Sequence, residues 1–190
     1  MRDIRVQFQF FSVKNRRHAI VFFSSKRENI MRIEMPEFAN AFPNLSEAVT
    51  LANRLFQGDG DFFTQVGAIP QFALSEHAAT RQPVTGAEIV PLLSQQIDVM
   101  VVTYKPWYVC SKATAKTILG EKVIQLNARK LQRSIDELVA TLVHECVHVV
   151  DTVPGMSFGH GNNFANGKKL TAPYRIGKIA QDLVPGLQAH

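Results

Sequence analysis

Apolar and polar residues alternate along parts of this chain with a period of two, which predicts β-strands. Residues 4–11 and 18–23 show this alternation on either side of a basic turn, so we expect an N-terminal hairpin there. Residues 98–104 are almost continuously apolar and predict a largely buried strand. Residues 121–127 alternate in part and predict a further strand just before the most apolar segment of the chain.

Other segments carry apolar residues at helical spacing between residues that begin and end helices. The stretch 44–47 (Asn-Leu-Ser-Glu) has the pattern of a capping box, which predicts a helix from there through Phe56. The turn-rich stretch 58–61 would end that helix. A shorter helix is expected near 86–94. A last helix is expected over 173–185, with a proline at its start and a Pro-Gly pair at its end.

The most apolar helix is expected over residues 135–152. Ser134 and Glu137 have capping-box spacing at its start, and Pro154-Gly155 follows its end. Its apolar residues recur at helical spacing and predict one stripe facing the core: Ile135, Leu138, Val139, Leu142, Cys146 and Val149.

The same segment contains the pattern H-E-x-x-H at His144, Glu145 and His148. Residues four apart lie on one face of a helix, so both imidazoles would face a single point, with a spacing that suits a zinc ion. The carboxylate of Glu145 would reach a water molecule on that metal rather than the metal itself. Zinc peptidases use a glutamate in this arrangement as the general base.

A catalytic zinc site needs three protein ligands and one open position. His160 and Asp151, which both follow the motif, are candidates for the third ligand. His160 lies between glycines in a turn-rich stretch that could fold back over the helix, and we favour it. Asp151, one turn beyond His148, would either bind zinc directly or accept the N–H of a ligand imidazole, and we favour the second role.

Hydrolysis of an amide passes through a tetrahedral oxyanion, which needs a hydrogen-bond donor beside the metal. Tyr174 and Arg175, at the start of the last expected helix, are candidates for that donor. We expect Tyr174 to act in catalysis with Glu145. The structural alternative is a tyrosine at the edge of the core whose hydroxyl is solvated.

The motif and its setting resemble the zincin metallopeptidases over residues 123–184, about a third of the chain. The resemblance implies a zinc-dependent peptidase in which an extended strand beside the motif helix binds the substrate backbone. The strand expected at 121–127 looks like that strand.

The chain departs from two branches of that superfamily. Metzincins have a glycine and a third histidine shortly after the motif, whereas this chain has Asp151 and Pro154 at those positions. Thermolysin-like enzymes use a later glutamate, and no glutamate follows residue 151. The longer gap to His160 is more similar to the SprT-like metalloproteases. It is also similar to small bacterial and phage H-E-x-x-H proteins with a Gly-His-Gly-x-Asn stretch followed by Ala-Pro-Tyr.

Length and composition suit one domain that builds its own core, since the chain has 190 residues of which 46% are hydrophobic. We expect an α+β fold in which a small mixed or antiparallel sheet packs on the motif helix. Residues 1–60 would form a hairpin and helix, and residues 95–190 the zincin-like catalytic part.

No apolar run approaches the roughly 18 residues of a membrane-spanning helix, so we expect no membrane partner. The first residues lack the apolar segment of a secretory signal, which indicates a cytoplasmic protein; a secretion route that needs no signal stays open. The two cysteines, Cys110 and Cys146, form no Cys-x-x-Cys pattern, and Cys146 is expected in the core.

The formal net charge is +5, with the densest basic clusters at 14–17 and 26–27. Such clusters suggest an anionic partner such as nucleic acid. No recognised nucleic-acid-binding motif accompanies them, so we favour a solvated turn and loop.

Three functions follow from these patterns. The first, which we favour, is a zinc metallopeptidase that acts on a protein or peptide substrate through metal-activated water, with Glu145 as general base. The second is a zinc hydrolase of a non-protein amide, such as a cell-wall peptide. The third is a non-enzymatic, zinc-stabilised module that binds nucleic acid. The glutamate of the motif argues against the third, because a structural zinc site gains nothing from a general base.

Overall fold

The computed structural model describes residues 30–35, 41–106, 113–118, 120–151, 155–159 and 171–189. The expected hairpin at 4–23, Cys110 and His160 lie outside these residues. The described part is α+β, with five α-helices and a small mixed sheet. None of the helices described has the length and apolarity needed to span a membrane.

The main sheet is mixed. Its strand order is β1 (Arg32–Glu34), β3 (Asp98–Tyr104), β5 (Val123–Asn127) and β4 (Ala115–Ile118). β1 and β5 run parallel to β3, whereas β4 runs antiparallel to β5. The strand predicted at 98–104 is confirmed, but the expectation that it is largely buried is wrong, since only Val99 and Val101 are buried. The strand predicted at 121–127 begins two residues late. Buried residues alternate along β3 and β5, which gives the sheet one core-facing side.

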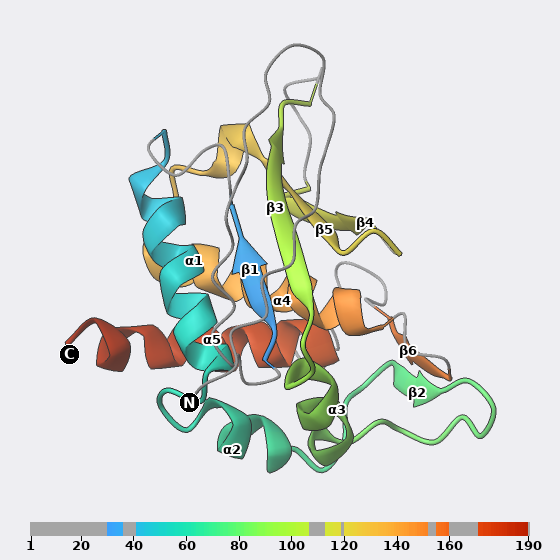
Figure 1. The fold of residues 1–190 in the computed structure, drawn as a ribbon. Coiled ribbons are helices and arrows are strands. Elements are labelled where there is room, and N and C mark those ends of the chain that lie inside the picture. Colours follow the sequence, from blue (N-terminus) through green and yellow to red (C-terminus); the bar gives the residue numbers. More distant parts are fainter. Residues whose placement is uncertain are drawn as a thin grey trace, which may run out of the picture.

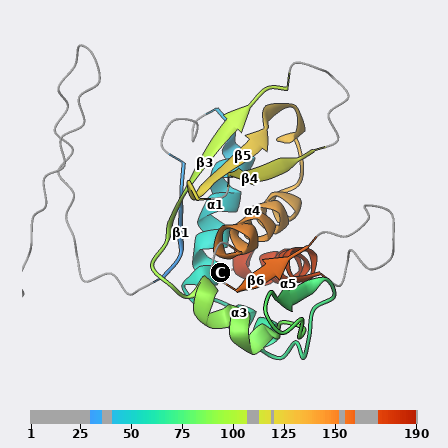
Figure 2. The ribbon, with the colours of Figure 1, turned by 90° about the vertical axis from the view of Figure 1, so that its right-hand side faces the viewer.

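Helix α4 (Ile135–Val150) forms the middle layer, between the sheet and helix α5 (Ala172–Gln188), as Figure 2 shows. Helix α1 (Pro43–Phe56) packs against α4 and against β1 (Figure 1). Because α4 meets protein on two sides, Val143, Val147 and Val150 are buried in addition to the stripe predicted from sequence. Cys146 is fully buried, which confirms its expected core position.

A second group of elements lies beneath the main sheet in the view of Figure 1. It contains α2 (Phe62–Gly67), α3 (Gly86–Leu93) and an antiparallel ribbon of β2 (Ser75–His77) and β6 (Met156–Phe158). A short 3-10 helix, η1 (Ala128–Lys130), joins β5 to the segment before α4. The helix expected near 86–94 is confirmed as α3.

Both predicted capping boxes are wrong in their hydrogen bonds. Helix α1 begins at Pro43, and the side chain of Asn44 donates to the carbonyl of Arg133 at 3.2 Å instead of capping the helix. Ser134 is the N-cap of α4, but its hydroxyl donates to the Glu137 carboxylate at 3.2 Å rather than accepting a backbone N–H. A capping box with both bonds occurs at α3.

The predicted end of the last helix is also wrong. α5 continues through Pro185 to Gln188, although proline cannot donate a backbone hydrogen bond. Beyond the proline, Leu187 is buried and its carbonyl accepts from the guanidinium of Arg54 at 2.9 Å. These tertiary contacts hold the last turn, so a local breaker does not decide the end of the helix.

Candidate functional site

Helix α4 carries the two histidines of the motif on one face. The ring centroids of His144 and His148 are 5.2 Å apart, and their planes meet at 64°. Two imidazoles bound through nitrogen at ~2.1 Å to one tetrahedral zinc would have centroids about 5 Å apart. The imidazole pair therefore fits the spacing that zinc requires, and nitrogen is a donor that zinc prefers.

Glu145 lies at the interface between α4 and the sheet. Its exposed fraction is only 6%. The hydroxyl of Thr117, on β4, lies 2.7 Å from Glu145 Oε2 and 3.1 Å from the Glu145 carbonyl. A hydroxyl has one proton, so the shorter contact to the carboxylate takes it. Thr117 therefore holds one carboxylate oxygen of Glu145 and links the motif to β4.

The environment of Glu145 changes its acidity. Burial raises the pKa of its carboxyl above the ordinary value for glutamate, while the hydrogen bond from Thr117 and the nearby His148 oppose the rise. A carboxylate whose pKa lies closer to neutrality is a better match for accepting a proton during hydrolysis. Burial also raises the pKa of the neighbouring Cys146 thiol, which keeps that residue protonated in the core.

Tyr174 reaches the motif from α5. Its ring packs edge-on against His144, with centroids 4.6 Å apart and planes at 81°. Close approach of the two helices depends on Gly177, because a Cβ there would lie 2.8 Å from the Ala140 carbonyl and 3.3 Å from His144 Cβ. Sequence reasoning missed this glycine. The available indication was an isolated glycine within an otherwise helical pattern.

Of the two candidate donors on α5, Tyr174 is the one that packs against a motif histidine. Arg175 instead lines a pocket with a volume of about 480 Å³, bordered by the segment 70–76. The two neighbouring residues therefore face different parts of the molecule, as residues one apart on a helix do.

Asp151 is the C-cap of α4. One of its carboxylate oxygens accepts from the backbone N–H of Phe158 at 2.9 Å, which ties β6 to the end of α4. The other oxygen lies 3.9 Å from His148 Nδ1, within ion-pair range but too far for a hydrogen bond. Asp151 thus lies on the Nδ1 side of His148, which is where an orienting carboxylate would stand.

The third ligand remains a prediction, because His160 lies outside the described residues. Within the described ranges, no three His, Cys, Asp or Glu side chains gather closely enough to hold a metal ion. The described part of the motif thus contributes two nitrogen donors and one buried carboxylate.

The strand beside the site is β4, which corrects the choice of residues 121–127. β5 lies inside the sheet between β3 and β4, so both of its edges are already paired. β4 is the outer strand on this side, contacts α4 and carries Thr117. Its four residues, Ala-Lys-Thr-Ile, are too few and too mixed to predict a strand.

No protein-family model, curated protein or solved structure matches this chain. The likeness of the motif to zincins therefore stays an expectation from sequence. A function has to be argued from the chemistry of the site, since the fold alone does not specify one.

Proposed function

We propose that this protein is a zinc-dependent metallopeptidase that hydrolyses peptide bonds, with Glu145 as the general base. One observation carries the proposal: a buried carboxylate, held by Thr117, lies beside two imidazoles whose spacing fits zinc. Burial of an ionisable group costs free energy, and a site that only stabilises the fold has no use for it. A general base for hydrolysis does.

His144, His148 and, outside the described residues, His160 would hold the metal. When bound, zinc would lower the pKa of a coordinated water molecule to about 7. Glu145 then accepts the proton of the attacking water and delivers it to the leaving amine. Thr117 binds one oxygen of the carboxylate, which leaves the other for the proton. Tyr174, packed against His144, would donate its hydroxyl to the developing oxyanion.

We assign the substrate backbone to β4. Among the described strands β4 pairs only with β5, so an extended peptide would add to the sheet along the other edge of β4. Thr117 lies on this strand and contacts Glu145, which would bring a peptide on β4 close to the general base.

The test is the Glu145→Gln variant, with Glu137→Gln on the same helix as the matched control. Zinc per chain is measured by elemental analysis, and turnover is measured with quenched fluorescent peptide pools. We expect about one zinc in both variants and a loss of at least ~100-fold in turnover for Glu145→Gln only. His160→Ala is expected to lose most of its zinc.

Two results would contradict the proposal. Wild type that contains no zinc, even after metal supplementation, would remove the metal centre. A Glu145→Gln variant that cleaves peptides as well as wild type would remove the assigned base. Profiling against cell-wall fragments in the same assay separates a peptidase from a hydrolase of non-protein amides.

A further inference from the structure

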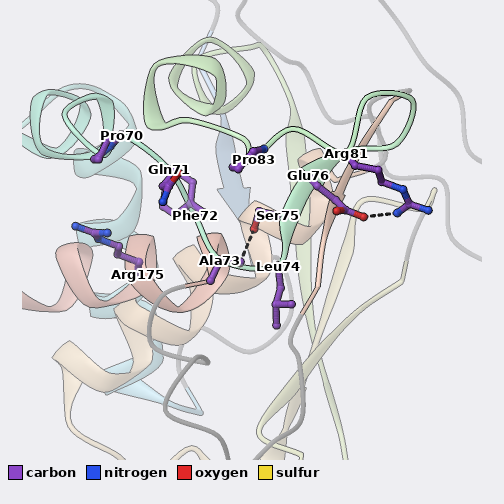
Figure 3. Close-up of a pocket in the computed structure, with 10 residues that line it drawn as sticks. All are labelled: Pro70, Gln71, Phe72, Ala73, Leu74, Ser75, Glu76, Arg81, Pro83 and Arg175. Carbon is purple, nitrogen blue, oxygen red and sulfur yellow. Dashed lines mark hydrogen bonds and ion pairs between the residues drawn. The ribbon is translucent and has the colours of Figure 1, made fainter.

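A pocket of about 480 Å³ lies between the segment 70–76 and the first turn of α5 (Figure 3). Its volume falls in the range of roughly 300–1,000 Å³ that is typical of ligand sites. Pro70 and Pro83, both exposed, contribute apolar surface. Arg175 contributes a guanidinium, which Figure 3 shows directed from α5 toward the Pro70 end of that segment. The pocket therefore combines apolar walls with a cation.

Among the described residues that line the pocket, the charges leave one cation in excess. At the far end, Arg81 forms an ion pair with Glu76, so those two charges compensate each other. The half-buried side chain of Arg175 has no hydrogen bond or ion pair with any of the described residues. A guanidinium presents a planar set of donors that matches a carboxylate, so the pocket is complementary to a carboxylate.

The rim of the pocket carries an unusual leucine. Leu74 is 55% exposed and has φ of 52°, a conformation that is uncommon for a bulky residue. Its carbonyl accepts from the N–H of Gly159 at 2.7 Å, which fixes this conformation from a second segment. An uncommon backbone conformation held by neighbouring segments motivates a functional hypothesis for this rim.

The pocket shares its supports with the candidate metal centre. Arg175 directly follows Tyr174, whose ring packs on His144. Ser75, in the pocket wall, accepts through its hydroxyl from the N–H of Ala172 at 3.3 Å. Through these two contacts, the first turn of α5 connects the pocket wall to a motif histidine.

We propose that this pocket is a specificity subsite, in which Arg175 binds the side-chain carboxylate of an acidic residue in the peptide substrate. The inference rests on the proposed peptidase function and adds a substrate class to it. The apolar walls would contact the methylene groups of the acidic side chain, and the guanidinium would take both carboxylate oxygens.

The test measures binding to the Glu145→Gln protein, so that it needs no turnover. The probes are pairs of fluorescein-labelled hexapeptide pools that differ only in carrying Glu or Gln at one fixed position, with each position tested in turn. At one position we expect the Glu pool to bind about three- to tenfold more tightly, which is typical of a partly exposed charge-assisted pair.

The matched variants are Arg175→Gln and Lys178→Gln. Both remove one positive charge from α5, but Lys178 is an exposed residue whose ammonium pairs with Asp182. We expect Arg175→Gln to abolish the preference for Glu and Lys178→Gln to keep it. Arg175→Glu is expected to transfer the preference to pools with Lys at the same position, which a variant that merely fails to fold would not do.

Equal binding of the Glu and Gln pools at every position would overturn the subsite. The same holds if both glutamine variants weaken binding equally, since that indicates a general effect of net charge. If the proposed peptidase function is wrong but the subsite exists, the pattern differs: wild type cleaves no peptide, yet binding still shows an Arg175-dependent preference for Glu. Cleavage of peptides without that preference removes the subsite alone.

Discussion

Helices α4 and α5 pack against each other, but they meet different surroundings. α4 has the sheet on one side and α5 on the other, so even Glu145 is buried. α5 covers α4 with one face and exposes Lys178 and Asp182 on the other. The difference separates two roles: α4 contributes the motif and much of the core, whereas α5 contributes side chains that complete and border the site. Changes in α4 should therefore act on folding, and changes in α5 more locally.

The largest effect is expected from truncating the core face of α4. Leu142 is fully buried, and Leu142→Ala should lower the free energy of unfolding by about 2–5 kcal/mol, because the middle layer cannot collapse around the cavity. The matched change on α5, Leu183→Ala, affects a half-buried residue at the edge of the core and should lower it by about 1 kcal/mol. Urea denaturation of both variants measures the difference. Equal losses would show that the two helices contribute equally to the core.

A second comparison uses two glycines of α5. Gly177→Ala should lower the free energy of unfolding by about 1–3 kcal/mol, because the added methyl meets the carbonyl of Ala140. A Cβ at Gly186 would have no atom of the described residues within 4 Å, so Gly186→Ala should raise stability by up to ~1 kcal/mol through helix propensity. Thermal unfolding of the two variants shows whether each substitution raises or lowers stability. A neutral Gly177→Ala would mean that the contact between the helices near His144 is not tight.

The smallest effect concerns Glu145 itself. Burial raises the pKa of the Glu145 carboxyl in the folded protein above the pKa of the same carboxyl in the unfolded chain. The protonated carboxyl therefore contributes stability below its unfolded-chain pKa, and this contribution is lost as the pH rises through its folded-state pKa. Glu145→Gln has no charge to bury. In metal-free protein at neutral pH we therefore expect this variant to exceed wild type in stability by on the order of 1 kcal/mol.

That difference should disappear below about pH 4, where the wild-type carboxyl is protonated in both the folded and the unfolded chain. Urea titrations of the two metal-free proteins at pH 4 and pH 7 measure it. If the variant were less stable than wild type at both pH values, the hydrogen bond from Thr117 would outweigh the burial of the charge.

The central features were predictable because their determinants are local. The apolar run of 98–104 predicted β3, and the spacing of His144, Glu145 and His148 predicted one face with two imidazoles. The core position of Cys146 followed from the same helical period. Pro185 was misread because a local rule was applied to a helix end that contacts from Arg54 hold in place.

Residues distant in sequence decided the rest. Thr117 meets Glu145 across 28 positions, and no local pattern connects a four-residue strand to a helix so far along the chain. Gly177 matters because α5 crosses α4 at Ala140, which is a property of packing.

The sequence by itself determined the chemistry: two nitrogen donors and a carboxylate at helical spacing, because a helix converts spacing directly into a shared face. Only the tertiary structure decided the surroundings of these side chains. Burial between two layers raises the pKa of Glu145, β4 supplies its hydrogen bond, and α5 directs Tyr174 to His144 and Arg175 into a pocket. Burial and contact depend on segments that meet only after the chain has folded.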